Sequence, residues 1–150
     1  MEPNEMDDRV AIRELIDSYA HNADRRLSEN QAALFTEDAV LDVYHGDPEK
    51  TKPVQSLRGR PELEKGFRES LSRYDVTMHF NGQSILRIEG DRATGETYCL
   101  AHHFWSEDGC RMILVMGIRY EDLFVRRGKQ WLFSERKLII DWTDKRSSDP

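Results

Sequence analysis

The stretch VTMHFNGQSILRIEGDRATGETYCLAHHFW, residues 76–105, decides the fold. Two runs rich in β-branched and aromatic residues flank the polar cluster Glu89-Gly90-Asp91-Arg92, a composition typical of two strands joined by a tight turn. Short connections of this kind join antiparallel neighbours. The pattern continues toward the C-terminus, with further turn clusters at residues 107–110 and 126–129. The chain from residue 76 onward therefore predicts four long antiparallel strands.

The segment at the start of the chain has the pattern of helices. Apolar residues recur every three or four positions from Ile12 to Ala23, after an acidic pair at residues 7–8, which predicts an amphipathic first helix. Ser28, followed three residues later by Gln31, is a capping-box signal for a short second helix that extends through Phe35.

The segment between these helices and residue 76 is mixed. Residues 39–44 have the composition of a short strand, and the polar residues 45–56 predict a loop. Pro61 is well placed at the first position of a third helix that opens at Arg60 and ends near Tyr74. Helices gathered before a meander predict an α+β domain in which about three N-terminal helices cover one face of a curved sheet.

The length and the charge narrow the possible classes. A chain of 150 residues has the size of one domain, and we expect a core over about 7–142 and a frayed tail over 145–150. The net charge of -6 gives no general attraction to phosphate backbones, so we do not expect a nucleic-acid partner. No stretch approaches the roughly 20 apolar residues of a membrane span, and the N-terminus lacks the features of a secretory signal.

These features predict a soluble cytoplasmic protein without a membrane partner. Cys99 and Cys110 form no CxxC pair, and in a reducing compartment we expect free thiols, although spacing alone leaves a disulfide open. The chain has no glycine-rich phosphate loop, dinucleotide-binding fingerprint or GxSxG motif. A reaction without a cofactor is therefore favoured.

The end of the first helix offers a phenol and a carboxylate. Tyr19 and Asp24 are five positions apart, which leaves them about 140° apart around an ideal helix. They converge if the helix ends at Asp24 and the chain turns there. An aspartate near a helix end is also commonly a cap or a surface charge, and the local sequence leaves that interpretation open.

Histidines lie on the first two strands of the meander. Thr77, His79 and Asn81 alternate onto one face of their strand. His102 and His103 point to opposite faces, so at most one of them shares a pocket with His79. No cysteine or carboxylate stands at a recognised ligand spacing from them, and we expect no metal site. A structural role is the alternative interpretation for each histidine.

The last strand contributes a cation. In residues 131–136, alternation places Arg136 on one face with Leu132 and Ser134. Arg136 is a candidate to bind an anionic group of a substrate, and a surface ion pair is the alternative.

Together these segments resemble the SnoaL-like family of the nuclear transport factor 2-like superfamily, over nearly the whole chain. Four stretches carry the likeness: Tyr19 with Ala23-Asp24-Arg25-Arg26, LFTEDA at residues 34–39, Thr77-Met78-His79-Phe80, and Trp131 with Ser134-Glu135-Arg136. The resemblance implies a cone-shaped barrel built from the curved, mainly antiparallel sheet.

The resemblance also implies a catalytic site. In the family's lyases, an aspartate at the position of Asp24 and a histidine at that of His79 form a dyad. The family further implies pocket roles for Tyr19, for a second histidine, where spacing favours His103, and for Arg136. The expected substrate-binding residues are Tyr44, Cys99, His102 and Trp142.

The resemblance implies a cofactor-independent lyase or isomerase, dehydratase-like, that acts on a small hydrophobic organic substrate in an enclosed pocket. Asp24 would orient His79, which takes a proton from carbon, while Tyr19 or a protonated His103 donates to a substrate oxygen. Because this fold hosts several chemistries, the alternatives are a polyketide cyclase-type enzyme, a non-catalytic ligand-binding or dimerisation module, and an accessory subunit of an oxygenase.

We also expect a homo-oligomer, either a dimer or a trimer. Domains of this type often associate through the sheet. The candidate partner surface is the sheet face near Ile113, Val115 and Ile118.

Overall fold

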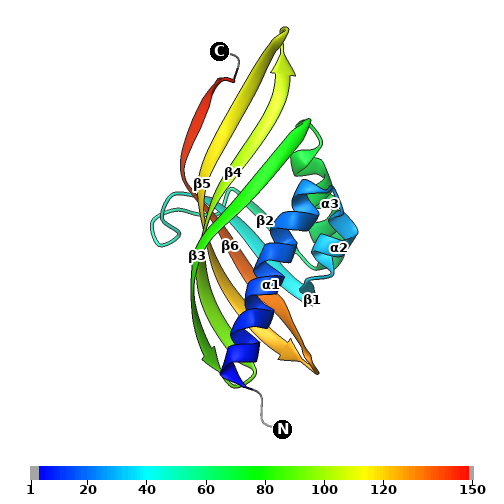
Figure 1. Cartoon of the computed structure of the whole chain (residues 1–150), viewed down its shortest axis with the longest axis vertical. Helices are drawn as coiled ribbons and strands as arrows, with labels where there is room; N and C mark the ends of the chain where they lie inside the picture. Colours follow the sequence, from blue (N-terminus) through cyan, green and yellow to red (C-terminus); the bar gives the residue numbers. More distant parts are fainter. Residues whose placement is uncertain (1–3, 149–150) are drawn as a thin grey trace.

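The computed structural model describes residues 4–148 and has the α+β architecture predicted from the sequence. Helices α1 (Glu5–Asp24), α2 (Ser28–Ala32) and α3 (Arg60–Leu71) lie on one side of a six-stranded sheet (Figure 1). The strands are β1 (Phe35–His45), β2 (Gln55–Arg58), β3 (Val76–Glu89), β4 (Arg92–Glu107), β5 (Cys110–Arg127) and β6 (Gln130–Ser147).

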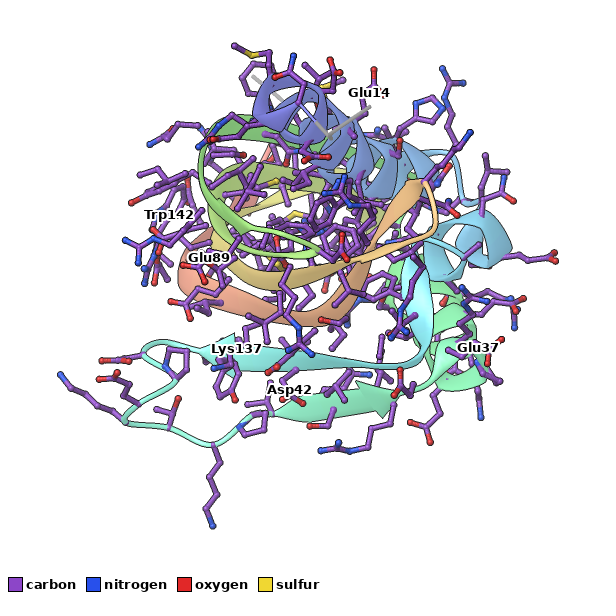
Figure 2. The ribbon with its side chains drawn as sticks, turned by 90° about the horizontal axis from the view of Figure 1, so that it is seen from below. Glu14, Glu37, Asp42, Glu89, Lys137 and Trp142 are labelled. Atoms are coloured by element: carbon purple, nitrogen blue, oxygen red, sulfur yellow. The ribbon has the colours of Figure 1, made fainter. Side chains whose placement is uncertain are left out.

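The sheet is mainly antiparallel and stays open. Its strand order is β2-β1-β6-β5-β4-β3, in which β1 pairs with β6 in parallel and the other neighbours are antiparallel. Viewed from below, the strands curve around the interior like the wall of a cone (Figure 2). The cone shape is confirmed, and its wall has free edges at β2 and β3.

The meander of β3 to β6 follows the sequence closely. Its hairpins turn at the predicted polar clusters, where Gly90 and Gly128 have φ values of 62° and 63°. Residues with a Cβ adopt this left-handed conformation only at a cost, so glycine suits these tight connections.

The segment from residue 28 to residue 58 differs from our expectation. Helix α2 ends at Ala32 instead of continuing through Phe35, and β1 begins at Phe35 instead of residue 39. Phe35 pairs with Phe133 of β6, and this long-range contact outweighs the local helical signal. Strand β2 forms where we expected the end of a loop. It was not predicted because its residues are largely exposed and show no apolar alternation.

The end of the chain is more ordered than predicted. Residues 145–147 continue β6 and pair with residues 112–114 of β5, so the expected fraying is wrong there. Residues 149–150 of the predicted tail lie outside the described residues.

The core lies between α1 and the inner face of the sheet. Ile12, Ile16 and Tyr19 of α1 are buried against aromatic residues of the strands, as the helical spacing predicted. Within residues 4–148, no helix is long and apolar enough to cross a membrane.

The opposite, outer face of the sheet carries exposed apolar side chains. Of the expected partner residues, Ile113 and Val115 lie on this outer face but are buried, and Ile118 faces the interior. Strand alternation places another set on the outer face: Val76, Met78, Phe80, Leu100 and Trp142.

Candidate active site

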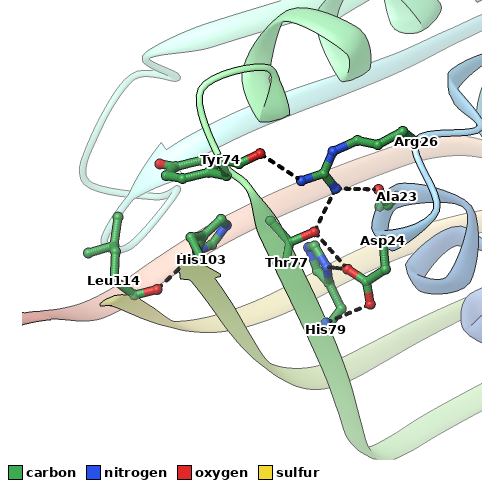
Figure 3. A network of polar contacts seen from close by, with 8 residues as sticks. All are labelled: Ala23, Asp24, Arg26, Tyr74, Thr77, His79, His103 and Leu114. Atoms are coloured by element: carbon green, nitrogen blue, oxygen red, sulfur yellow. Dashed lines mark hydrogen bonds and ion pairs between the residues drawn. The ribbon is translucent and has the colours of Figure 1, made fainter. Parts of the chain in front are cut away.

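Asp24 is the last residue of α1, and both of its carboxylate oxygens are bonded to β3 (Figure 3). Oδ1 accepts hydrogen bonds from Nδ1 of His79 at 2.7 Å and from the Thr77 hydroxyl at 3.0 Å. Oδ2 accepts the backbone N–H of His79 at 2.9 Å. Burial by itself raises the pKa of Asp24, but the hydrogen bonds from His79 and Thr77 outweigh it and hold the pKa below its usual value.

The ionised Asp24 determines the form of His79. A carboxylate can only accept, so Nδ1 of His79 carries a proton. The His79 side chain is only 8% exposed. Within residues 4–148, no other residue forms a hydrogen bond with its Nε2. In its neutral form this imidazole has its lone pair on Nε2, where it can act as a base.

The geometry follows from the local sequence in the way that alternation predicted. Thr77, His79 and Asn81 lie on one face of β3, and all three contact α1. Asn81 donates to Asp17 at 3.0 Å, about two helical turns before Asp24. Helix α1 ends at Asp24, as predicted, and its carboxylate reaches the strand from there.

Arg26 supports this cluster, a role that the local sequence did not predict. Its guanidinium donates to the Thr77 hydroxyl at 2.7 Å, to the Ala23 carbonyl at 2.9 Å and to the Tyr74 carbonyl at 3.3 Å (Figure 3). The Thr77 hydroxyl oxygen accepts a hydrogen bond from Arg26, so the hydroxyl proton is left to bind Asp24. The signal in the sequence was an arginine two residues after the helix end, and only the fold shows which groups it contacts.

His103 is the second imidazole of the site. Its Nδ1 lies 3.0 Å from the carbonyl oxygen of Leu114, which can only accept, so this nitrogen carries the proton (Figure 3). Burial lowers the pKa of His103 to about 4. The ring is therefore neutral near pH 7 and its Nε2 is an acceptor. The expectation that a protonated His103 donates to the substrate is wrong.

Both imidazoles line one cavity of about 180 Å³ between the helices and the sheet. The ring centroids of His79 and His103 are 6.1 Å apart. Most of the remaining wall consists of apolar side chains from α3, β1, β5 and β6. A largely apolar hollow with a few convergent polar groups is the usual form of a site for a small organic molecule.

Two buried phenols belong to the polar part of the lining. Tyr19 and Tyr120 belong to the cavity wall, and their ring centroids are 5.7 Å apart. Burial raises the pKa of each phenol, so both hydroxyls stay protonated near pH 7. Tyr19 thus lies where the sequence analysis placed it, while Tyr120 was not identified because nothing local distinguishes it from a core residue of a strand.

Arg136 lies behind these phenols and is absent from the cavity wall. It is fully buried and donates through Nε and Nη2 to Asp122 at 2.8 and 3.2 Å. Its guanidinium stacks over the rings of Tyr120 and Tyr19, 3.6 and 4.2 Å from their centroids. The expectation of direct substrate binding by Arg136 is therefore corrected, since tyrosine rings and an ion pair enclose the guanidinium.

Two expected substrate-binding residues belong to other parts of the fold. Leu41 and Val43 of β1 face the cavity, so the neighbouring Tyr44 faces away from it. Cys99 is 4% exposed and packs in the core, where burial raises the pKa of its thiol to about 11. Cys99 and Cys110 are both free thiols, as expected.

The other two lie on the outer face of the sheet. His102 pairs with Val115 and points away from the cavity that its neighbour His103 enters. Trp142 is half exposed, and its indole ring crosses Gly117 on the outer face. A Cβ at Gly117 would come within 2.1 Å of that ring, so the glycine permits the crossing. Substrate binding by His102 and Trp142 in this cavity is excluded by their side of the sheet.

The described part of the chain contains no group of three or more histidine, cysteine or acidic residues placed to hold a metal ion. The polar side chains that line the cavity belong to His79, His103, Tyr19, Tyr74, Tyr120, Gln31, Gln55, Ser70 and Arg73, and the carboxylate of Asp24 lies behind His79.

Comparison with known proteins agrees with this architecture. The model of a SnoaL-like domain family matches residues 4–137. An uncharacterized protein from Mycobacterium tuberculosis is 26% identical over 133 residues, which cover 88% of this chain and 84% of that protein.

Solved structures of similar fold include two with named activities. A candidate scytalone dehydratase from Novosphingobium aromaticivorans has a TM-score of 0.78 and 23% identity, covering 97% of this chain and 94% of its own. The hexachlorocyclohexane dehydrochlorinase LinA-type3 from Novosphingobium barchaimii has a TM-score of 0.79 and 16% identity, covering 97% of this chain and 94% of its own. At these identities the likeness establishes the fold.

Proposed function

Because the chain belongs to the SnoaL-like domain family, we propose that it is a cofactor-independent lyase or isomerase of dehydratase type. Its substrate is a small hydrophobic organic molecule, and its general base is His79, oriented by Asp24. One observation carries this proposal: a carboxylate holds an imidazole at 2.7 Å, and that imidazole lines a mostly apolar cavity with its other nitrogen available.

The proposed reaction begins with proton transfer from carbon. Nε2 of His79 takes the proton, and the carboxylate of Asp24 stabilises the imidazolium that forms. The electron pair left on carbon passes to an adjacent carbonyl, where the protonated phenols of Tyr19 and Tyr120 are candidate donors to the developing oxyanion. General acid-base catalysis of this kind contributes about 10² to 10⁴ in rate.

The second half of the reaction distinguishes the two classes. In an elimination, the imidazolium of His79 gives its proton to the leaving hydroxyl, water departs and a carbon–carbon double bond remains. In an isomerisation, the same proton returns to a different carbon. Both routes restore neutral His79. The dehydratase and dehydrochlorinase named above support elimination, because each of those names describes loss of a proton together with a leaving group.

The test follows proton transfer alone, so it does not depend on the leaving group. A panel of small ketones and β-hydroxy ketones is incubated with the protein in D₂O, and loss of the carbon-bound proton is measured by NMR. We expect exchange with the wild-type protein and none with His79→Asn. Asparagine has no basic nitrogen, so exchange should stop. It keeps a donor toward Asp24, so the thermal stability of the variant should stay near that of the wild type. Equal exchange by both proteins would refute the base assignment.

The alternatives give different results in the same assay. A polyketide cyclase-type enzyme would exchange the proton and then form a carbon–carbon bond. A ligand-binding module would bind panel members without exchange.

A homo-oligomer is also part of the proposal, with a second copy of the chain covering the outer face of the sheet. The supporting observation is the exposure of Met78, Phe80 and Trp142, which are 60%, 68% and 50% exposed. Contiguous exposed apolar residues commonly mark interaction surfaces. We place the protein in the cytoplasm, where its free thiols would stay reduced.

A further inference from the structure

A second hollow adjoins the cavity at Arg73 and Tyr74, and we call this boundary the mouth of the cavity. This outer hollow has a volume of about 340 Å³ and is lined by Arg73, Tyr74, Trp105, Glu107, Leu114 and Lys145. Arg73 and Tyr74 also line the inner cavity, so they lie at the boundary between the two spaces. A ligand that reaches His79 from the outer hollow passes these two residues.

The charges around this boundary are not balanced. Among the residues that line the two hollows, the ionised side chains are Arg73, Lys145 and Glu107. Lys145 lies 3.9 Å from Glu107, which partly neutralises both. Arg73 forms no ion pair with any residue in the described range 4–148, although the chain is acidic overall. The mouth of the cavity therefore presents a guanidinium without a counterion.

Stacking holds this guanidinium in place. Its Cζ lies 5.0 Å from the centroid of the Tyr74 ring. The Tyr74 ring is in turn 4.7 Å from the His103 ring, which is 6.1 Å from that of His79 (Figure 3). A guanidinium stacked on an aromatic ring keeps its N–H edges free, and these edges match a carboxylate through two parallel hydrogen bonds.

We propose that the substrate is an organic acid whose carboxylate binds Arg73 at the cavity mouth while its apolar body extends inward to His79. This inference rests on the proposed function of the same site and adds the class of substrate. The row of Arg73, Tyr74, His103 and His79 places the anionic group and the reacting carbon at opposite ends of the molecule. An elongated, partly aromatic acid fits that arrangement.

Equilibrium binding tests the inference without any turnover. The probes are 3-phenylpropanoate and its neutral amide, 3-phenylpropanamide, which share size and shape, and affinities are measured by calorimetry at low salt. We expect the wild-type protein to bind the acid about tenfold more tightly than the amide, the value of one exposed charged contact of about 1.4 kcal/mol. Arg73→Gln should abolish this preference.

The matched control is Arg68→Gln. Arg68 is an exposed residue of α3, the helix that ends two residues before Arg73. It pairs with Glu64 at 2.6 Å and lines neither hollow. Arg68→Gln removes the same charge as Arg73→Gln but outside both hollows. It should therefore leave the preference for the acid intact. Equal binding of acid and amide, failure of the acid to bind, or a preference that persists in Arg73→Gln would overturn the inference.

These outcomes separate the inference from the proposed function. His79→Asn should keep the preference for the acid, because it changes the base and not the mouth. Loss of proton exchange with a retained acid preference would reject the chemistry alone, whereas proton exchange on neutral ketones without an acid preference would reject the substrate class alone.

Discussion

Asp24 and His79 are joined by two hydrogen bonds, one to each carboxylate oxygen. The ring Nδ1 donates to Oδ1 at 2.7 Å and the backbone N–H donates to Oδ2 at 2.9 Å. A single side chain at the end of α1 therefore positions both the strand and the ring. The orientation of the base depends on the ionised form of Asp24, and this relationship leads to the first two predictions.

Asp24→Asn should disturb the tautomer of His79. An amide cannot accept at both positions, so one of the two donors of His79 faces an NH₂ group. We expect the signal of a protonated Nδ1 in the wild-type protein, measured by long-range ¹H–¹⁵N NMR, and a shifted or mixed tautomer in the variant. Proton exchange should fall by about 10² or more. Asp17→Asn, which changes the contact with Asn81 on the same helix, is the control and should leave the His79 spectrum unchanged.

Thr77→Val should raise the pKa of Asp24 toward its usual value. The Thr77 hydroxyl is one of the groups that lower this pKa, and valine keeps the shape without the donor. A depressed carboxyl pKa stabilises the fold above the unfolded pKa, and this stability is lost as pH falls through the folded pKa. We expect a loss of about 1 kcal/mol at pH 7, measured by urea unfolding, with the pKa followed by ¹³C NMR. Thr77→Ser should behave like the wild type, and an unaltered pKa in the valine variant would contradict the prediction.

His103 should make the stability depend on pH between about 6.5 and about 4. Its folded pKa is about 4 against an ordinary value of 6.5, so in this window the unfolded chain binds a proton that the folded chain does not. Stability therefore falls as pH falls, by at most about 1.4 kcal/mol per pH unit from this residue. Urea unfolding across the window measures the slope. His103→Asn retains a donor for Leu114 and should reduce the slope of stability against pH. His102→Asn on the outer face should leave that slope unchanged.

Arg136 should be required for stability without contacting the ligand. Arg136→Met leaves Asp122 buried without its partner and should cost about 3–5 kcal/mol. The double variant Arg136→Met with Asp122→Leu removes both charges and should recover much of that loss in urea unfolding. We expect the double variant to bind 3-phenylpropanoate nearly as well as the wild type. A folded double variant with strongly reduced affinity for 3-phenylpropanoate would show instead that Arg136 contributes to ligand binding.

Phe80→Glu should separate the proposed oligomer into monomers. Phe80 is 68% exposed on the apolar outer face, and a second copy would bury the new charge without a partner. Gel filtration with light scattering measures the mass. Met6→Glu changes a residue on α1 that is 64% exposed and should leave the mass unaltered. A wild-type protein that is already a monomer at high concentration would remove the oligomer from the proposal.

Much of the fold follows from local patterns in the chain. The turn clusters of residues 89–92, 107–110 and 126–129 mark the hairpins, since tight connections need glycine and polar residues wherever they occur. Alternation along β3 correctly grouped Thr77 with His79. Alternation along β4 separated His102 from His103. These successes share one cause: the direction of successive side chains on a strand is a property of the backbone itself.

Local patterns do not say which face is covered or how deep a side chain lies. Tyr44 and Trp142 occupy faces that the sequence could not assign, and Arg136 is on the inner face but behind two tyrosine rings. The early start of β1 at Phe35 likewise depends on its partner Phe133. In each case the deciding contact joins residues far apart in the chain, and its energy is absent from any local window.

The sequence by itself determined the order of the helices and strands and which residues share a face of each strand. It also identified Asp24 and His79 as the candidate dyad. Only the tertiary structure decided that Asp24 reaches His79, that His103 is neutral and that Arg73 lies at the cavity mouth without an ion pair to any residue in the range 4–148. Backbone geometry acts between neighbours in the chain, whereas burial, tautomer and charge balance depend on groups brought together by folding.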